Sequence, residues 1–491
     1  MTYDTLIRRA CIVDGTGADT YVADIGIRGD RIVAIGDLAA GLASQVIEAE
    51  GRYLAPGFID VHTHDDSCAI QQPEMLPKIT QGVTTVIVGN CGISASPVNV
   101  TGEVPDPMNL LGEADAFFTT FGDFAQAVDA ASPAVNVAAL IGHTTLRAAA
   151  MDRFDRTATD SEITTMRESL RKALQAGAIG LSSGLAYTNA RQSTSEEVKA
   201  LVEVVGKEGG LYATHMRNER EALFEAMDEA FETAAHGKVA LVISHLKCAD
   251  VENWGKTEHA IEKLEQAAAR QPCNCDCYPY AACSTTLDLW RVSEAFDILV
   301  TWSKPHPEMG RKLLKDIAAE WAVDLTEAAR RLMPAGAIYH NMDEADVRRV
   351  LAHPLTMIGS DGLPSDPNPH PRLWGSFPRI IGHYCRDEGL FGLPEAIRKM
   401  TSMSAARFGL ADRGVIREGA FADLTLFDFD SVRDGASFLE PTTPAIGIEW
   451  VMVNGRLSLV DGTVKARAGR LLRRPGSLAN AGHEPHSVPA H

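Results

Sequence analysis

Two histidines separated by one residue, His62 and His64, lie in the segment GFIDVHTH, whose apolar residues are typical of a buried β-strand. Because side chains alternate along a strand, both imidazole groups project from the same face, where they could bind one metal ion. A pair of this kind occurs often in proteins and does not establish a site by itself. Its significance depends on the residues at the ends of the other predicted strands.

Four further apolar segments also end in residues that can bind metal: Cys91 in GNCG, His215 in ATHMR, His245 in ISHLK and Asp361 in GSDG. Imidazole, thiolate and carboxylate groups all suit zinc, and a catalytic zinc keeps one position open for water. Zinc lowers the pKa of a bound water towards about 7 and polarises an amide carbonyl. Asp361 is the candidate general base, which would accept the water proton and pass it to the leaving nitrogen. For the isolated SDG segment, an aspartate that fixes a turn is the alternative interpretation.

These residues stand in a long middle region where strand-like segments mostly alternate with helical patterns. The eight expected strands are GFIDVHTH, VTTVIVGNCG, VNVAALIGHT, AIGLSSGLAY, LYATHMR, ALVISHLK, NCDCYPY and LTMIGSDG. Helices are expected at residues 160–176, where Asp160 can cap the first turn, and at 195–208 and 219–235. Eight strands in this alternation predict an α/β fold, a (β/α)8 barrel with its active site at the carboxyl ends of the strands.

The two ends of the chain have a different pattern, in which short segments of alternating apolar and polar residues lie between Gly-containing turns. We expect residues 1–56 and 412–475 to pair into one small β-sandwich domain, and residues 57–411 to form the barrel. Residues 285–345 form a helical, Trp-containing insertion between strands seven and eight and are a candidate lid. Residues 476–491 are rich in Gly, Ser, Pro and His, so this tail is predicted to be disordered, and its histidines are not expected to be ligands.

Composition restricts the class of protein. The 491 residues carry a formal net charge of -19, which argues against a nucleic-acid or anionic-membrane partner. No stretch has the apolar length of a signal peptide or a membrane span, so we expect a cytoplasmic protein. Nine cysteines are too few for a disulfide scaffold of this size. Cys273, Cys275 and Cys277 lack the spacing of a metal site and are expected to be buried thiols.

The motifs together resemble the amidohydrolase superfamily and, more closely, its branch of N-acyl-D-amino acid deacylases, the D-aminoacylases. The resemblance runs from about Tyr3 to about Gly469 and includes GFIDVHTHDD, GVTTVIVGNCG, GHTTLR, THMRNE, SHLK, YPY, PAGAIY, GSDGLP and HPRLWGSFPR. The cysteine in GNCGIS, with no lysine in the fourth segment AIGLSSGLAY, points to this branch. The resemblance implies zinc-dependent hydrolysis of N-acyl-D-amino acids, which are small-molecule substrates.

The resemblance also implies a division of the metal ligands into two sites. Cys91, His215 and His245 match a tightly held zinc, whereas His62, His64 and Asp361 match a second, weaker position to which Cys91 could bridge. Asp361 matches the general base of the family. Whether one or two zinc ions serve the active form is left open, as is the oligomeric state.

Four other residues match positions that hold the substrate carboxylate in this branch: Lys247, Tyr278, Ser284 and Arg372. Lys247 lies two residues after His245, so strand alternation turns both side chains to one side. His143 and Arg291 are possible pocket residues, and His370 and Arg217 could equally line the pocket or stabilise a loop. We expect neutral or hydrophobic substrate side chains, with Arg291 leaving acidic ones open.

Two alternative functions remain. A hydantoinase-like cyclic amidase or a dipeptidase acting on β-linked peptides would use similar chemistry, but most such relatives bridge their metals through a lysine of strand four, which is absent here. A catalytically dead barrel that acts as an assembly protein would be expected to lose ligands, whereas all six candidates are present. Comparing hydrolysis of N-acyl-D- and N-acyl-L-amino acids would distinguish these functions.

Overall fold

Eight parallel strands form the centre of the protein in the computed structural model, which describes residues 2–477. They are β6 (Phe58–Asp60), β7 (Val83–Val88), β8 (Asn136–Gly142), β9 (Gly180–Gly184), β10 (Leu211–His215), β11 (Leu241–Ile243), β12 (Cys273–Cys277) and β16 (Thr356–Ile358). Each pairs with its neighbours in chain order, and every strand residue is buried. The expected barrel is confirmed, and each of the eight apolar segments supplies one strand.

The barrel closes between its first and last strands, where the backbone pairing is sparse. A hydrogen bond of 3.5 Å from Val61 to Ile358 and a bridge between Thr63 and Gly362 join β6 to β16. Side chains strengthen this seam, because the fully buried Lys78 of α2 (Leu76–Ile79) contacts residues from both strand ends. Its contacts are Asp60 Oδ2 at 2.8 Å, Asp65 Oδ2 at 3.2 Å and Ser360 Oγ at 2.8 Å. Such compensation is what a buried ammonium requires.

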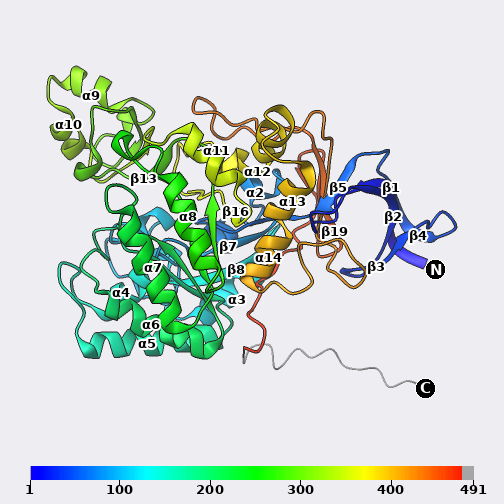
Figure 1. Ribbon diagram of the computed structural model, residues 1–491, viewed down its shortest axis with the longest axis horizontal. Coiled ribbons are helices and arrows are strands. Elements are labelled where there is room, and N and C mark those ends of the chain that lie inside the picture. Colours follow the sequence, from blue (N-terminus) through cyan, green and yellow to red (C-terminus); the bar gives the residue numbers. More distant parts are fainter. Residues whose placement is uncertain (1, 478–491) are drawn as a thin grey trace.

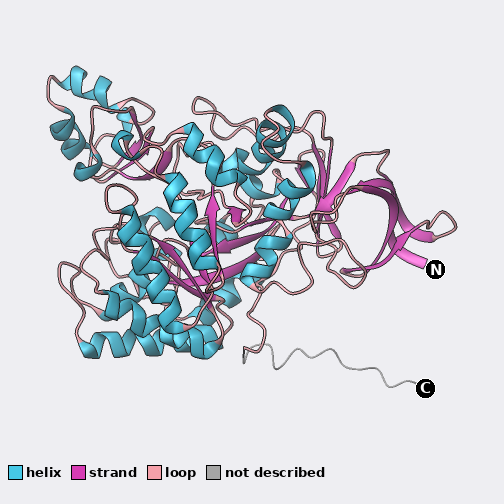
Figure 2. Ribbon diagram, in the orientation of Figure 1, coloured by secondary structure: helices cyan, strands magenta, loops and turns pink. Residues whose placement is uncertain are grey.

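Helices surround the strands (Figures 1 and 2). The α-helices around the barrel, in addition to α2, are α1 (Cys68–Gln71), α3 (Phe121–Ala131), α4 (His143–Ala150), α5 (Asp160–Gln175), α6 (Ser195–Glu208), α7 (Leu223–Gly237), α8 (Thr257–Ala268), α11 (Glu344–Ala352), α12 (Arg372–Arg379), α13 (Leu393–Met400) and α14 (Ser402–Phe408). A π-helical segment, η6 (Ile380–Asp387), continues α12, and short 3-10 turns occur at η1 (Met108–Leu111), η2 (Ala114–Ala116) and η3 (Val251–Asn253). The expected helix at 195–208 has the bounds of α6.

Two helix starts differ from the sequence expectation. Helix α5 is capped by Thr159 and not by Asp160. The Thr159 hydroxyl accepts from the backbone N–H of Glu162, and the Glu162 carboxylate accepts from the backbone N–H of Thr159, a capping box that satisfies donors at both positions. Helix α7 begins at Leu223, four residues later than expected, because Glu219 belongs to the loop that follows β10.

Segments from both ends of the chain form one nine-stranded sheet beside the barrel (Figure 1). Its strands are β1 (Thr2–Ile12), β2 (Tyr21–Arg28), β3 (Arg31–Gly36), β4 (Leu42–Glu48), β5 (Tyr53–Pro56), β17 (Leu424–Phe427), β18 (Ile448–Val453), β19 (Arg456–Val460) and β20 (Thr463–Val464). Antiparallel pairing of β17 with β5 joins the two ends. The sheet curves over an apolar core that includes Ile25, Leu54 and Trp450. The expectation of a separate β-domain built from both ends is confirmed.

The long segment between β12 and β16 contains strands as well as the expected helices. Strands β13 (Cys283–Thr286), β14 (Ile298–Ser303) and β15 (Ala335–Tyr339) form an antiparallel sheet in the order β13-β15-β14. The helical part consists of η4 (Leu289–Arg291), η5 (Pro307–Met309), α9 (Leu314–Trp321) and α10 (Leu325–Leu332). The sheet was missed because its strands are short and far apart in sequence. The tail that was predicted to be disordered lies, from residue 478 onward, outside the described residues.

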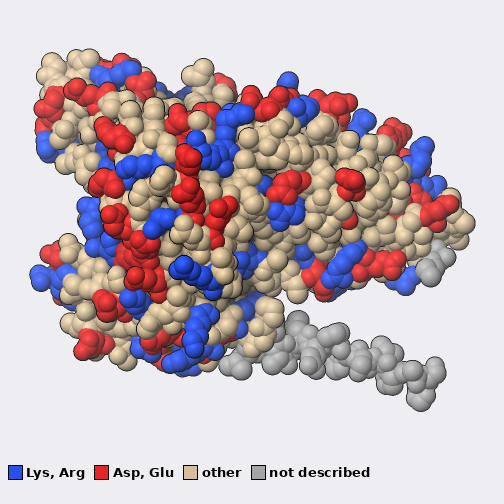
Figure 3. Space-filling model, viewed as in Figure 1, with Lys and Arg blue, Asp and Glu red and all other residues tan. Residues whose placement is uncertain are grey.

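The surface seen in Figure 3 carries acidic and basic side chains intermixed over the barrel and the small sheet. Within residues 2–477, no helix is both long and apolar enough to cross a membrane. The cysteines expected to be buried thiols, Cys273, Cys275 and Cys277, are buried in β12.

Candidate metal centre and active site

The carboxyl ends of the barrel strands bring the six predicted metal ligands together. They are His62 and His64 after β6, Cys91 after β7, His215 at the end of β10, His245 after β11 and Asp361 after β16. All six are buried, and they form two groups that share Cys91. One group consists of Cys91, His215 and His245, and the other of His62, His64, Cys91 and Asp361.

The first group has the dimensions of a zinc site. Cys91 Sγ lies 3.5 Å from His245 Nε2, which lies 3.0 Å from His215 Nδ1. In a tetrahedral site with Zn–N of about 2.0 Å and Zn–S of about 2.3 Å, ligand atoms stand roughly 3.3–3.6 Å apart. One thiolate and two imidazoles of this spacing fit zinc and leave a fourth position open.

The second group lies beside the first across the same sulfur atom. His62 Nε2 is 3.1 Å from Cys91 Sγ and 3.4 Å from Asp361 Oδ1, and His64 Nε2 is 3.3 Å from the same Asp361 oxygen. These donors also suit a divalent transition metal. Cys91 belongs to both groups, so its sulfur would be shared if each group held an ion.

The backbone at three of the ligands adopts a conformation that side chains usually avoid. The φ angles of Cys91, His245 and Asp361 are 53°, 35° and 49°, all in the left-handed region. Such conformations cost about 1–3 kcal/mol each and persist where the surrounding structure enforces them, commonly at functional sites. The strand ends are therefore shaped to present these three side chains to one another.

The electrostatics favour the ionised forms of the thiol and the carboxyl group. Burial alone would raise the pKa of Cys91, but the charges of His62 and His245 and hydrogen bonds from neighbouring imidazoles hold it well below its usual range. Burial would likewise raise the pKa of Asp361, but Arg372 and the adjacent histidines lower it well below its ordinary value. A thiolate is the form that binds metal, and a carboxylate is the form that accepts a proton.

Two carboxylates behind the ligands were missed by the sequence analysis. Glu219 Oε1 lies 3.0 Å from His245 Nδ1, and its Oε2 lies 3.6 Å from His215 Nε2. Asp276 Oδ1 lies 3.2 Å from His62 Nδ1 and accepts from the backbone N–H of His245. Carboxylates in such positions orient metal-binding histidines. The available signals were weak: Glu219 stands in the THMRNE motif, and Asp276 lies between two cysteines of β12.

The residues expected to hold the substrate carboxylate lie next to the metal groups. Arg372 Nη1 is 2.9 Å from Asp361 Oδ2, its Nη2 donates to the Ser284 carbonyl oxygen, and its guanidinium stacks on the Tyr278 ring at 4.5 Å. Lys247 Nζ is 2.6 Å from Glu219 Oε1. Among the described residues, Arg372 Nε has no hydrogen-bond partner, so one N–H of the guanidinium is available.

Arg291 belongs to the same neighbourhood. The Cys283 thiol lies among the charges of Arg291, Lys247 and Arg372, which oppose the rise in its pKa that burial causes. The Arg291 side chain is only 6% exposed, and its ion pair with Asp288 is long at 3.9 Å. Within the described part of the chain its Nε makes no hydrogen bond. A buried guanidinium with so little compensation is unusual.

The other candidates for the pocket have structural partners. His143 Nε2 lies 2.8 Å from Glu197 Oε1, a carboxylate that also binds Arg147, so the structure places His143 against helix α6 and not with the metal ligands. Arg217 pairs with Glu229 of helix α7 at 2.8 Å. His370 Nδ1 accepts from the backbone N–H of Arg372 and thereby supports the start of α12.

Two pockets lie between the loop after β7 and the insertion, and none of the predicted site residues lines them. These adjoining pockets, of about 310 and 570 Å³, share residues of the loop after β7 and Trp302 of β14. The smaller one also includes Leu363 and Asp366, which follow Asp361 closely in the chain. The insertion contacts the active site directly, because the Ser284 carbonyl oxygen of β13 accepts from Arg372 at 3.0 Å.

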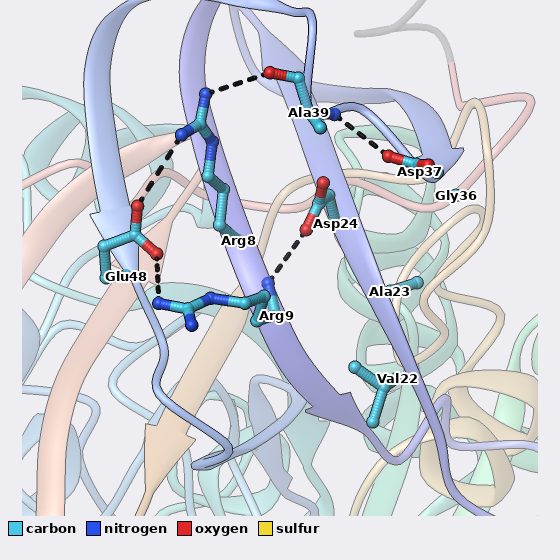
Figure 4. Close-up of a pocket in the computed structure, with 9 residues that line it drawn as sticks. All are labelled: Arg8, Arg9, Val22, Ala23, Asp24, Gly36, Asp37, Ala39 and Glu48. Carbon is cyan, nitrogen blue, oxygen red and sulfur yellow. Dashed lines mark hydrogen bonds and ion pairs between the residues drawn. The ribbon is translucent and has the colours of Figure 1, made fainter.

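A separate pocket of about 570 Å³ lies in the small sheet (Figure 4). Its charged groups already pair with one another or with the backbone. Arg9 lies 3.0 Å from Glu48, and Asp24 accepts from the backbone N–H groups of Arg9 and Leu38. None of the predicted metal ligands lines this pocket. It therefore does not combine metal ligands with an unpaired donor, as the barrel site does with Arg372 Nε.

Comparisons with known proteins agree with this geometry. A model of the amidohydrolase family matches residues 45–458. The chain is 46% identical over 474 residues to a D-aminoacylase of Alcaligenes xylosoxydans xylosoxydans, covering 96% of this chain and 98% of that one. It is 44% identical over 479 residues to an N-acyl-D-glutamate deacylase of the same organism, with 97% and 98% covered. An N-acyl-D-glutamate deacylase structure from Bordetella bronchiseptica, with zinc and a phosphonate mimic of the tetrahedral intermediate, superposes with a TM-score of 0.94 at 43% identity, covering 96% of this chain and all of that one.

Proposed function

This chain belongs to the amidohydrolase family, in its branch of N-acyl-D-amino acid deacylases. On that basis we propose roles for its residues in the reaction and a class of substrate. The enzyme is a metal-dependent hydrolase that cleaves the amide bond of an N-acyl-D-amino acid to a carboxylate and a free D-amino acid. The observation that carries the assignment of roles is the pair of ligand groups that share Cys91, with Asp361 and Arg372 beside them.

Cys91, His215 and His245 would hold a zinc ion, which when bound would supply Lewis-acid chemistry for amide hydrolysis. Asp361, whose pKa is held low by Arg372 and the histidines, is ionised and can accept the water proton. The same carboxyl group then donates that proton to the leaving nitrogen. Burial of the ligands excludes bulk water from these steps.

The substrate carboxylate is held by cationic groups that lie beside the metal ligands. Arg372 offers its Nε–H, and the ring of Tyr278 keeps the guanidinium plane in place. Lys247 supplies a second charge from the loop after β11. The acyl group of the substrate would lie at the metal, and its carboxylate would lie at Arg372. The side chain of the substrate then provides the third contact, and three contacts are needed to distinguish a D- from an L-amino acid.

The reaction is tested with matched N-acetyl-D- and N-acetyl-L-amino acids. We expect kcat/KM for the D-series to exceed that of the L-series by at least about 100-fold, because only one enantiomer can make all three contacts at once. Removal of zinc with a chelator should abolish the activity, and added zinc should restore it. Equal turnover of both antipodes, or hydrolysis of cyclic amides alone by zinc-loaded protein, would contradict the proposal.

The buried charge of Arg291 favours an acidic substrate side chain, the alternative that the sequence left open. Trp290 and Tyr339 place aromatic rings at 4.4 and 5.9 Å from this guanidinium, and Asp288 provides only a long contact. Leaving a guanidinium buried without a close anionic partner costs free energy, and a substrate carboxylate would offset that cost. Neutral side chains would leave the charge uncompensated.

We therefore expect N-acetyl-D-glutamate or N-acetyl-D-aspartate to be a better substrate than N-acetyl-D-methionine. Arg291→Met should lower kcat/KM for the acidic substrates by roughly 100-fold, since it removes a charge-assisted bond in a buried site. It should change the rate with the neutral substrate by less than about threefold. Arg330→Met, an exposed arginine on α10 of the same insertion, is the control. A parallel loss with both substrate classes would contradict a role in selecting the side chain.

We also propose that the enzyme acts in the cytoplasm. All nine cysteines are free thiols, and eight of them are buried. Reduced cysteines are typical of proteins in reducing compartments.

A further inference from the structure

A single buried carboxylate, that of Glu219, lies against three functional side chains. Glu219 is 6% exposed and stands in the loop between β10 and α7. It contacts both histidines of the tight metal group and the ammonium of Lys247. Glu219 Oε1 lies 2.6 Å from Lys247 Nζ, and this ion pair compensates the burial of both side chains. Among the described carboxylates, only Glu219 is paired with His215, His245 and Lys247 together.

The geometry assigns a definite ring nitrogen to each contact. His245 presents Nε2 to Cys91 and His215, so its Nδ1 is the nitrogen left to carry hydrogen. Glu219 Oε1, at 3.0 Å, is the acceptor for that N–H. His215 presents Nδ1 to the metal group, and its Nε2 has no hydrogen-bond partner among the described residues. Glu219 Oε2 lies 3.6 Å from this nitrogen, so the carboxylate acts on His215 through its charge and not through a direct hydrogen bond.

The position of Lys247 depends on the same carboxylate. In the structure, Lys247 Nζ lies 2.8 Å from His245 Nδ1 and 2.6 Å from Glu219 Oε1. An imidazole that binds metal through Nε2 carries hydrogen on Nδ1, so it cannot accept a hydrogen bond from an ammonium group. Lys247 then keeps Glu219 as its anionic partner and donates to the His245 carbonyl oxygen at 3.3 Å, which leaves one N–H group for a substrate.

We propose that Glu219 is a positioning residue that fixes the metal-binding form of His215 and His245 and at the same time holds Lys247 ready for the substrate carboxylate. The proposal rests on the proposed function for the role of Lys247. Its consequence is that one carboxylate controls both the affinity for zinc and the KM for the acyl amino acid. Carboxylates behind metal-binding histidines typically contribute 10–100-fold to metal affinity.

The test uses the full-length Glu219→Gln variant, with zinc affinity measured by competition with a chromophoric chelator after metal removal. We expect affinity to fall 10–100-fold. At saturating zinc, KM for the N-acyl-D-amino acid should rise at least roughly tenfold through the misplaced Lys247. Glu219→Asp keeps the charge on a shorter side chain, and its zinc affinity should lie between those of Glu219→Gln and the wild type.

The matched control is Glu221→Gln, the same change at an exposed carboxylate two residues later whose partner is Asn218. It should leave both quantities within twofold of the wild type. Unchanged zinc affinity and KM in Glu219→Gln would overturn the proposal. The proposal would also be overturned if Glu219→Gln and Glu219→Asp lost zinc affinity equally and both metal-free proteins were less thermally stable than the wild type. That result would show damage to the fold. Zinc affinity is measured without substrate, so its outcome is independent of the reaction assigned to the enzyme.

Discussion

Asp361→Asn should lower kcat by roughly 1,000-fold or more while the protein retains its tightly bound zinc. The amide cannot accept a proton from water at neutral pH, so the step assigned to Asp361 is lost. Cys91, His215 and His245 form the tight group without Asp361, and their ligand atoms are unchanged by the substitution. Asparagine also tolerates the left-handed backbone at this position, so the effect should be chemical and not conformational.

The measurements are steady-state turnover of the preferred N-acyl-D-amino acid and metal content after gel filtration. Asp461→Asn provides a control, because Asp461 has φ of 48° and is exposed in a turn of the small sheet. It should behave as the wild type. A rate for Asp361→Asn within tenfold of the wild type would remove Asp361 from the role of general base.

Cys91→Ala should abolish tight zinc binding and, with it, activity. Cys91 is the ligand common to both metal groups, and its thiolate is stabilised by the surrounding imidazoles. Two neutral histidines alone are a poor site for zinc in competition with a chelator. We expect less than about one tenth of an equivalent of zinc after dialysis, with unchanged circular dichroism in the far ultraviolet.

Cys385→Ala is the corresponding control for loss of a buried thiol. Cys385 lies in η6, and burial raises its pKa to about 11, so it remains a protonated thiol at neutral pH. This variant should retain zinc in the same amount as the wild type. Near-stoichiometric zinc in Cys91→Ala would show that the tight site is elsewhere.

Much of the barrel and its ligand set could be predicted from the sequence. A strand buried on both faces must be apolar throughout, which made segments such as VTTVIVGNCG recognisable. Polar residues that interrupt such a run at its carboxyl end, as Cys91 and Asp361 do, are conspicuous for the same reason. That the two ends of the chain form one β-domain was predicted from their similar strand patterns, and the pairing of β5 with β17 is where the structure joins them.

The features that were missed depend on partners that are distant in sequence or on a choice between adjacent residues. Thr159 and Asp160 are both good capping residues, and the capping box formed with Glu162 decided between them. The role of Glu219 depends on its contacts with His245 and Lys247, which no local pattern reveals. Strand β13 pairs with β15 across about fifty residues, so neither segment is distinctive by itself.

The sparse pairing at the seam between β6 and β16 also bears on how the molecule assembles. His62 and Asp361 meet across this seam although they stand 299 positions apart in the chain. The chain up to β12 contains every predicted metal ligand except Asp361. It also contains Lys78 and its aspartate partners, but not Ser360. The ligands of the tight group therefore all come from strands that precede the last strand in the chain, whereas the catalytic base follows that strand.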